Sequence, residues 1–152
     1  MKYLLSPHDD DSVLFAAFTC LREKPTVVIV TDSCVQPLRG EIGCSAEARA
    51  KESEEAHKIL GCPMVRLGLR DDDLTLEHFV EALKKLDGSA DVIYTPALEG
   101  GHLQHDLVTI AAASVFGLQR LQCYSTYSRH SRYFGHDLNP VGTKGIEWTR
   151  EE

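Results

Sequence analysis

The chain has 152 residues, of which 43% are hydrophobic and 26% charged, and this is long enough for one domain with a buried core. Its net charge of -7 argues against general nucleic-acid binding, because contact with the phosphate backbone requires a basic surface. No stretch is apolar over membrane-spanning length and the start lacks the apolar region of a signal peptide, so we expect a cytoplasmic protein without a transmembrane segment. The five cysteines form no C-x-x-C pair, which indicates reduced thiols.

Short apolar runs typical of strands alternate along the chain with longer segments of helical period. TVVIVTD, at 26–32, contains four consecutive Val and Ile residues and predicts a strand buried on both faces. Ser45 and Gly61 are suitable first and last caps for a helix. In chain order we expect a strand at 2–6, a helix at 12–23, a strand at 26–32, a loop at 35–45, a helix at 45–61, a strand at 64–69, a helix at 75–88, a strand at 90–96, a helix at 105–118 and a strand at 121–128.

This alternation predicts a three-layer α/β fold, with a mostly parallel sheet and helices on both of its faces. We expect one domain over 1–152, with a short, irregular C-terminal segment from about 129. Ligand sites in such folds lie at the carboxyl ends of the strands. The polar segments PHDDD, TDS and LEGGHLQHD follow the first, second and fourth expected strands, so they should converge at one edge of the sheet.

Two pairs of candidate metal ligands occur in these polar segments. His8 and Asp11 are three residues apart in a tight turn, and His102 and His105 have the same spacing at the start of a helix. Two histidines and a carboxylate, with coordination positions left open, suit a catalytic Zn²⁺ site. The same donors also suit Fe²⁺, so the ligand types do not select the metal.

Each pair also has a purely structural interpretation. Asp9, Asp10 and Asp11 could form an acidic helix N-terminus, and the two later histidines could be capping or surface residues. However, three adjacent acids repel one another unless a cation offsets their charge. Because both pairs are expected at the same edge of the sheet, we favour the metal site.

These segments resemble the signatures of the LmbE/PIG-L-like family of zinc-dependent N-acetylglucosamine de-N-acetylases. PHDDDS resembles the family's A-H-P-D-D-E, and GGHLQHDLV resembles its H-P-D-H. VVIVTDS stands where the family has a strand ending in T-D-G, and RAKESEEAHKILG fits its R-x-x-E helix closing on Leu-Gly. The matches run in the family's order from residue 3 to about residue 127.

The resemblance implies a Rossmann-like fold and a hydrolase that removes the acetyl group from an N-acetylglucosamine-like substrate through a zinc-activated water. The partner would be a small acetamido sugar or glycoconjugate, and a homo-oligomer is compatible with the sequence. By position, the resemblance implies roles for six residues: zinc ligands His8, Asp11 and His105; general base Asp10; His102, which steadies the oxyanion or protonates the leaving amine; and Arg49 near the substrate pocket.

The chain departs from the family pattern at three positions of these signatures. Asp9 replaces a proline and Ser12 a glutamate, while Gln104 stands where the second signature has an acid that should orient the neighbouring His102. Family members are also typically longer. The segment 126–137 could supply a substitute wall of the substrate pocket, although a solvated loop is slightly favoured; its candidate contacts are Arg129, His130 and Arg132.

Two other functions compete with the deacetylase. In a haloacid-dehalogenase-like phosphatase, Asp9 would be the nucleophile, with Asp11, Thr31 and Mg²⁺ beside it, but the histidines would have no role. A catalytically inactive metal-binding relative would explain Gln104 and the short C-terminus.

Three further polar features are given structural roles. The acidic run RDDDL at 70–74 is interpreted as a helix cap or a solvated loop rather than a second metal site. His57 and His78 lie in helical patterns and are predicted to be ordinary surface residues.

Overall fold

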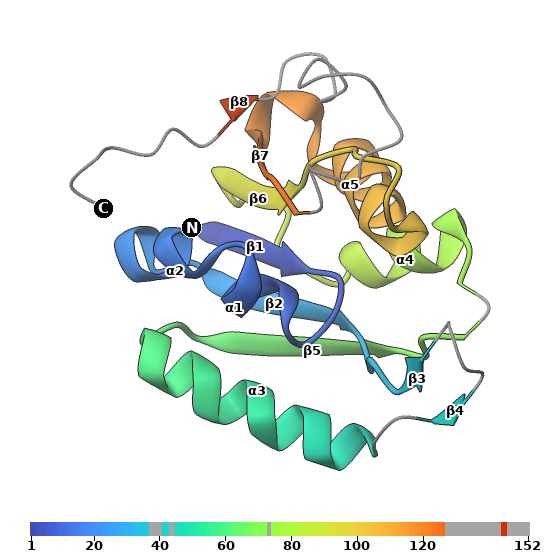
Figure 1. Ribbon diagram of the computed structural model, residues 1–152. Helices are drawn as coiled ribbons and strands as arrows, with labels where there is room; N and C mark the ends of the chain where they lie inside the picture. Colours follow the sequence, from blue (N-terminus) through green and yellow to red (C-terminus); the bar gives the residue numbers. More distant parts are fainter. Residues whose placement is uncertain (37–40, 43–44, 73, 127–143, 146–152) are drawn as a thin grey trace.

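The computed structural model describes residues 1–36, 41–42, 45–72, 74–126 and 144–145 (Figure 1). Six strands form one sheet in the order β5–β2–β1–β6–β7–β8, and every neighbouring pair is parallel. They are β1 (Lys2–Ser6), β2 (Thr26–Thr31), β5 (Met64–Leu69), β6 (Val92–Pro96), β7 (Leu121–Tyr124) and β8 (Lys144–Gly145). A separate antiparallel pair consists of β3 (Val35–Gln36) and β4 (Glu41–Ile42).

Helices cover both faces of the sheet, which confirms the predicted three-layer α/β fold (Figure 1). One layer contains α1 (Asp11–Leu14), α2 (Ala17–Glu23) and α3 (Ala46–Leu60). The opposite layer contains α4 (Leu76–Leu83) and α5 (Leu103–Phe116), followed by the short 3₁₀ helix η1 (Leu118–Arg120). Within the described ranges, no helix combines the length and the apolar character needed to span a bilayer.

The neighbouring strands β1 and β2 send alternate side chains into two separate cores. In β1, Leu4 packs with Ile29 on the side of α2, whereas Leu5 packs with Val28 and Phe79 on the side of α4 and α5. All of these side chains are fully buried. This burial on both faces explains why β2 reads as an uninterrupted run of Val and Ile rather than as an alternating pattern.

Local sequence signals position α3 correctly. The Ser45 hydroxyl accepts a hydrogen bond from the amide of Ala48, and Gly61 ends the helix with a φ of 66°. The expected helix at 12–23 is wrong in one respect, because it is two helices separated at Phe15 and Ala16. Neither residue is a glycine or proline, so no breaking signal marks this point in the sequence.

Other boundaries differ from the predicted ones by a few residues. Helix α4 ends at Leu83 rather than at residue 88, β7 ends at Tyr124, and β6 begins only at Val92. Helix α5 begins at Leu103, two residues earlier than predicted, so that His102 becomes its N-cap. These ends do not alter the layers or the order of the sheet.

Candidate active site

The structure brings the two predicted ligand pairs together beyond the carboxyl ends of β1 and β6. Asp11 opens α1 and is almost fully buried, and its Oδ2 lies 3.1 Å from Nδ1 of His8. The same oxygen lies 3.2 Å from Nε2 of His105, which is buried in the first turn of α5. One carboxylate oxygen therefore faces one nitrogen from each of two histidines that are 97 positions apart in the sequence.

His102 completes a cluster of three imidazoles. Its ring centroid lies 4.7 Å from that of His8 and 4.8 Å from that of His105. One nitrogen from each ring lies within 4.8 Å of the others, a separation that would allow a metal ion to be shared. Among the residues that the structure describes, the buried Nδ1 of His102 has no hydrogen-bond partner.

The charges of this cluster depend on close contacts as well as on burial. Burial disfavours the charged form of His8, but hydrogen bonds to Asp11 and Asp71 outweigh it and raise the pKa of His8 to about 10. Burial likewise opposes the ionisation of Asp11, yet hydrogen bonds to His105 and His8 keep the pKa of Asp11 below its usual range. Burial and the charges of His8 and His105 lower the pKa of His102 to about 4, so His102 is neutral at neutral pH.

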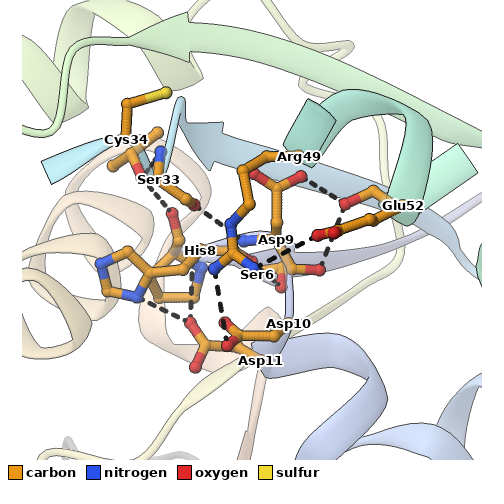
Figure 2. A network of polar contacts seen from close by, with 12 residues as sticks. Ser6, His8, Asp9, Asp10, Asp11, Ser33, Cys34, Arg49 and Glu52 are labelled. Atoms are coloured by element: carbon orange, nitrogen blue, oxygen red, sulfur yellow. Dashed lines mark hydrogen bonds and ion pairs between the residues drawn. The ribbon is translucent and has the colours of Figure 1, made fainter. Parts of the chain in front are cut away.

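Asp10 and Arg49 lie beside this cluster and are more exposed to solvent than Asp11 is. Arg49 extends from α3, and its Nη2 lies 3.7 Å from Oδ2 of Asp10 (Figure 2). The side chain of Asp10 is 48% exposed, in contrast to the 3% of Asp11. A carboxylate that a ligand can reach thus adjoins the buried one, with a guanidinium group next to it.

Asp9 points away from the histidines and is neutralised within the protein. Both of its carboxylate oxygens accept hydrogen bonds from Arg66 of β5, and Oδ1 also accepts one from Ser53 of α3. The expectation that the acid triplet needs a bound cation is therefore wrong for Asp9, because Arg66 supplies the positive charge. Only Asp11 of the triplet contacts the histidine cluster through an ion pair in the described structure.

Asp71 is a site residue that the sequence interpretation missed. Its side chain is 4% exposed, and Oδ1 lies 3.7 Å from Nε2 of His8. The assignment of 70–74 to a cap or solvated loop is thus wrong for Asp71, although Asp72 is exposed and pairs with exposed Arg70. The signal was available, because this run follows β5 and parallel strands end at the same edge.

Gln104 contacts a different histidine from the one that the family resemblance implies. Its Oε1 lies against Nε2 of His8, and its Nε2 donates hydrogen bonds to Asp71. The expectation that residue 104 orients His102 is therefore wrong, because Gln104 contacts His8 instead. The sequence could not show this, because Gln104 and His102 are close along the chain whereas His8 is near its other end.

His57 is not the surface residue that was predicted. It is 1% exposed, and its imidazole contacts the Ser12 hydroxyl at 2.9 Å and the Ser53 carbonyl at 2.7 Å. His78 is exposed, as predicted, and forms a capping box with Thr75. His57 thus joins α3 to α1, next to Asp11, whereas His78 caps its own helix.

Thr31 and the segment 126–137 are the two remaining candidate groups named from the sequence. Thr31 is buried and donates a hydrogen bond to the carbonyl of Pro7, so it supports the loop after β1. The residues proposed as a wall of the substrate pocket lie outside the described residues: Arg129, His130 and Arg132.

The sequence matches the family described as GlcNAc-PI de-N-acetylase (PIG-L) over residues 3–116, which is most of the chain. The chain belongs to the PIG-L family. This match confirms the resemblance seen in the two signatures and includes the loop after β1 and all of α5. No curated protein matches the sequence.

Solved structures show the same fold as this PIG-L family member. N,N'-diacetylchitobiose deacetylase from Pyrococcus horikoshii is 22% identical with a TM-score of 0.62, over 78% of this chain and 49% of that protein. The A40926 pseudoaglycone deacetylase Dbv21 is 18% identical with a TM-score of 0.62, over 92% and 68%. The conserved protein TT1542 from Thermus thermophilus is 23% identical with a TM-score of 0.56, over 97% and 67%. The chain spans about half the length of the first of these proteins.

Proposed function

We propose that this protein is a metal-dependent hydrolase that removes an acetyl group from the amide nitrogen of an N-acetylglucosamine-like substrate. The observation that carries the proposal is the meeting of His8 Nδ1, Asp11 Oδ2 and His105 Nε2 beside the accessible carboxylate of Asp10. Membership of the PIG-L family supports this reaction class, and two of the proteins with the same fold are named deacetylases. A cytoplasmic location and assembly into a homo-oligomer stay predictions.

The donors fit a Zn²⁺ ion. His8, Asp11 and His105 would hold it, because Oδ2 of Asp11 faces one nitrogen of each histidine. His102 is a further nitrogen donor within reach, and its buried Nδ1 has no hydrogen-bond partner within the described part of the chain. Two histidines and a carboxylate also suit Fe²⁺, so the choice of Zn²⁺ rests on the family resemblance. When bound, such an ion polarises a carbonyl group and lowers the pKa of water.

The remaining groups would act on the substrate and on protons. Asp10 would accept a proton from the attacking water at its carboxylate, since that side chain is half exposed while Asp11 is enclosed. Arg49 would orient Asp10 and contact the substrate next to it. His102 carries a single proton at neutral pH, so it can donate one hydrogen bond to the developing oxyanion.

The contacts of Asp9 argue against the phosphatase alternative. A nucleophilic carboxylate needs an accessible oxygen, but Asp9 is buried and bonded to Arg66 and Ser53. That alternative also gives no role to the histidine cluster. An inactive metal-binding relative would have the same metal site, so only a measurement of acetate release distinguishes it from a deacetylase.

The reaction is tested by measuring acetate release across a panel of acetamido sugars, before and after treatment with a chelator. We expect release from at least one substrate, loss of release on chelation and recovery with one equivalent of Zn²⁺. Metal binding without acetate release from any substrate would favour the inactive relative. Mg²⁺-dependent release of phosphate that persists in His105→Ala would favour the phosphatase.

The ligand set is tested by the metal content of three alanine variants, at His105, His102 and Asp11. His105→Ala should lose the bound ion, because Nε2 of His105 faces Asp11. His102→Ala should retain the ion and lose acetate release. If His102→Ala loses the ion and Asp11→Ala retains it, the three histidines form the ligand set instead.

A further inference from the structure

Both histidines that face Asp11 use their second ring nitrogen in a hydrogen-bonded chain. Nε2 of His8 contacts Oε1 of Gln104, and the amide nitrogen of Gln104 donates to the Asp71 carbonyl at 3.1 Å and to the Asp71 carboxylate. We call Gln104 and Asp71 the first relay. A carboxylate from the loop after β5 is thereby connected to a histidine in the loop after β1.

The acceptors of Asp71 determine the orientation of the Gln104 amide. A carbonyl and an ionised carboxylate only accept hydrogen bonds, so the NH₂ group of Gln104 must face Asp71 and its oxygen must face His8. That oxygen is also only an acceptor, and Nε2 of His8 must therefore carry a hydrogen. In the neutral imidazole, Nδ1 is then the nitrogen with the lone pair, and Nδ1 is the atom beside Asp11.

The other histidine has an equivalent arrangement built from different residues. Nδ1 of His105 lies 3.3 Å from the Thr126 hydroxyl, which donates its one hydrogen to Glu99 at 2.9 Å. We call Thr126 and Glu99 the second relay. Because the hydroxyl hydrogen is used, Thr126 must accept from Nδ1–H of His105, and this leaves the lone pair on Nε2, which faces Asp11.

Glu99 is itself held in place. It is 8% exposed and accepts hydrogen bonds from the Ser125 hydroxyl at 2.8 Å and from the Thr126 amide at 3.0 Å. Asp71 is similarly enclosed, and its backbone amide donates to Asp32 at 3.0 Å. Each relay therefore ends on a fixed carboxylate rather than on a mobile surface group.

We propose that the two relays fix the tautomers of His8 and His105, which makes Asp71 and Glu99 positioning residues of the metal centre. In the first relay, Asp71 fixes the orientation of the Gln104 amide, and the amide oxygen in turn fixes the tautomer of His8. This deepens the proposed function and rests on it, since it assumes that the two histidines bind the metal. Hydrogen-bonding partners of this kind typically change metal affinity by about 10- to 100-fold when they are removed.

The first relay is tested by Zn²⁺ affinity, measured in competition with a chromophoric chelator. In Asp71→Asn the side chain at 71 offers a donor as well as an acceptor, so only the backbone carbonyl at 71 still requires the NH₂ group of Gln104 to face it. The orientation of Gln104 is then held less firmly, and we expect affinity about 10- to 100-fold weaker. The control is Asp72→Asn, which removes the adjacent but exposed carboxylate. It should bind Zn²⁺ as tightly as the parent.

A second substitution should rescue the first. In the double variant Asp71→Asn/Gln104→Glu, the carboxylate at 104 accepts directly from His8 and also from the new amide at 71. We expect its affinity to return to within about threefold of the parent, whereas Gln104→Glu alone places two carboxylates against each other and should weaken binding. A purely structural loss at Asp71 would not be rescued in this way.

The second relay is tested by a pair of substitutions at one position. Thr126→Val removes the hydroxyl with little change in shape and should weaken Zn²⁺ binding by about tenfold, while Thr126→Ser keeps the hydroxyl and should bind as the parent. Circular dichroism of the chelator-treated variants checks that they fold. If Asp71→Asn does not fold, the Thr126 pair and the double variant still decide the matter.

Parental affinity in Asp71→Asn or in Thr126→Val would overturn the corresponding relay, and so would failure of Gln104→Glu to rescue Asp71→Asn. These measurements need no turnover. The predicted affinity pattern in a protein that releases no acetate would overturn the proposed reaction alone. An active parent whose variants all bind Zn²⁺ equally would overturn the relays alone.

Discussion

Asp9 and Arg66 form a buried ion pair that joins the loop after β1 to β5, two strands away in the sheet. Nη2 of Arg66 donates to Oδ2 of Asp9 at 2.9 Å, and Nη1 donates to the other carboxylate oxygen. The Asp9 side chain is 3% exposed and that of Arg66 is 23% exposed. The segment that carries His8 and Asp11 is thus anchored to β5 through Asp9.

Replacement of Arg66 by methionine should destabilise the fold. It keeps much of the apolar stem but leaves the Asp9 charge buried without its partner, and such a loss typically costs about 3 kcal/mol or more. Urea unfolding measures this cost. Arg70→Met is the matched control, because its pair with Asp72 is exposed to solvent and should contribute little to stability. Equal stability of the two variants would contradict the anchoring role of Asp9.

Gly100 and Gly61 provide a second matched pair, since each has a φ of 66°. Alanine at either position is strained in this left-handed region and should cost about 1 kcal/mol of folding stability. Gly100 lies in the turn leading to His102 and α5, whereas Gly61 ends α3. Gly100→Ala should therefore also weaken Zn²⁺ binding, measured by chelator competition, while Gly61→Ala should not. Equal Zn²⁺ affinities would show that the Gly100 turn does not position the ligands.

His57 should contribute to the pH dependence of stability. Burial is the main cause that lowers its pKa below the ordinary value of 6.5. The unfolded chain therefore takes up a proton at higher pH than the folded chain does. The folding stability contributed by neutral His57 is fully present above pH 6.5, and it is lost as the pH falls toward the pKa of His57 in the folded state.

The test compares urea unfolding of the parent and His57→Gln between pH 5 and 7.5. The parent should lose more stability on acidification than the variant, because glutamine does not titrate. His78→Gln, which replaces an exposed histidine, should keep the parental pH dependence. The same slope in His57→Gln as in the parent would show that His57 is not buried in its neutral form.

Periodicity predicted the sheet and its two helical layers because β1 and β2 are buried on both faces and α3 has clear caps. Parallel strands end at one edge of a sheet, and this predicted that the loops after β1 and β6 would meet. The argument also applied to the acidic run at 70–74 after β5, but a helix-capping interpretation was preferred there. Asp71 was missed because an acid that caps a helix and an acid that faces a site look alike in sequence.

Side-chain contacts between residues that are far apart in the chain could not be predicted from the sequence. Arg66 is one of many charged residues, and nothing in its strand indicates that it contacts Asp9, which is 57 positions away. Position 104 was expected to act on the neighbouring His102 because the family's second signature has an orienting acid there, yet the contact of Gln104 is with His8. His57 was predicted to be exposed because it lies in a helical pattern, and its burial depends on α1, whose Ser12 contacts it.

The central claim is that Asp10 moves a proton at a metal centre built by its neighbours. The most direct measurement is acetate release by Asp10→Asn, compared with the parent at equal Zn²⁺ content. Asparagine keeps the shape but accepts a proton poorly, so release should fall by about 100-fold or more while one ion per chain is retained. Parental acetate release by the Zn²⁺-loaded variant would contradict the account.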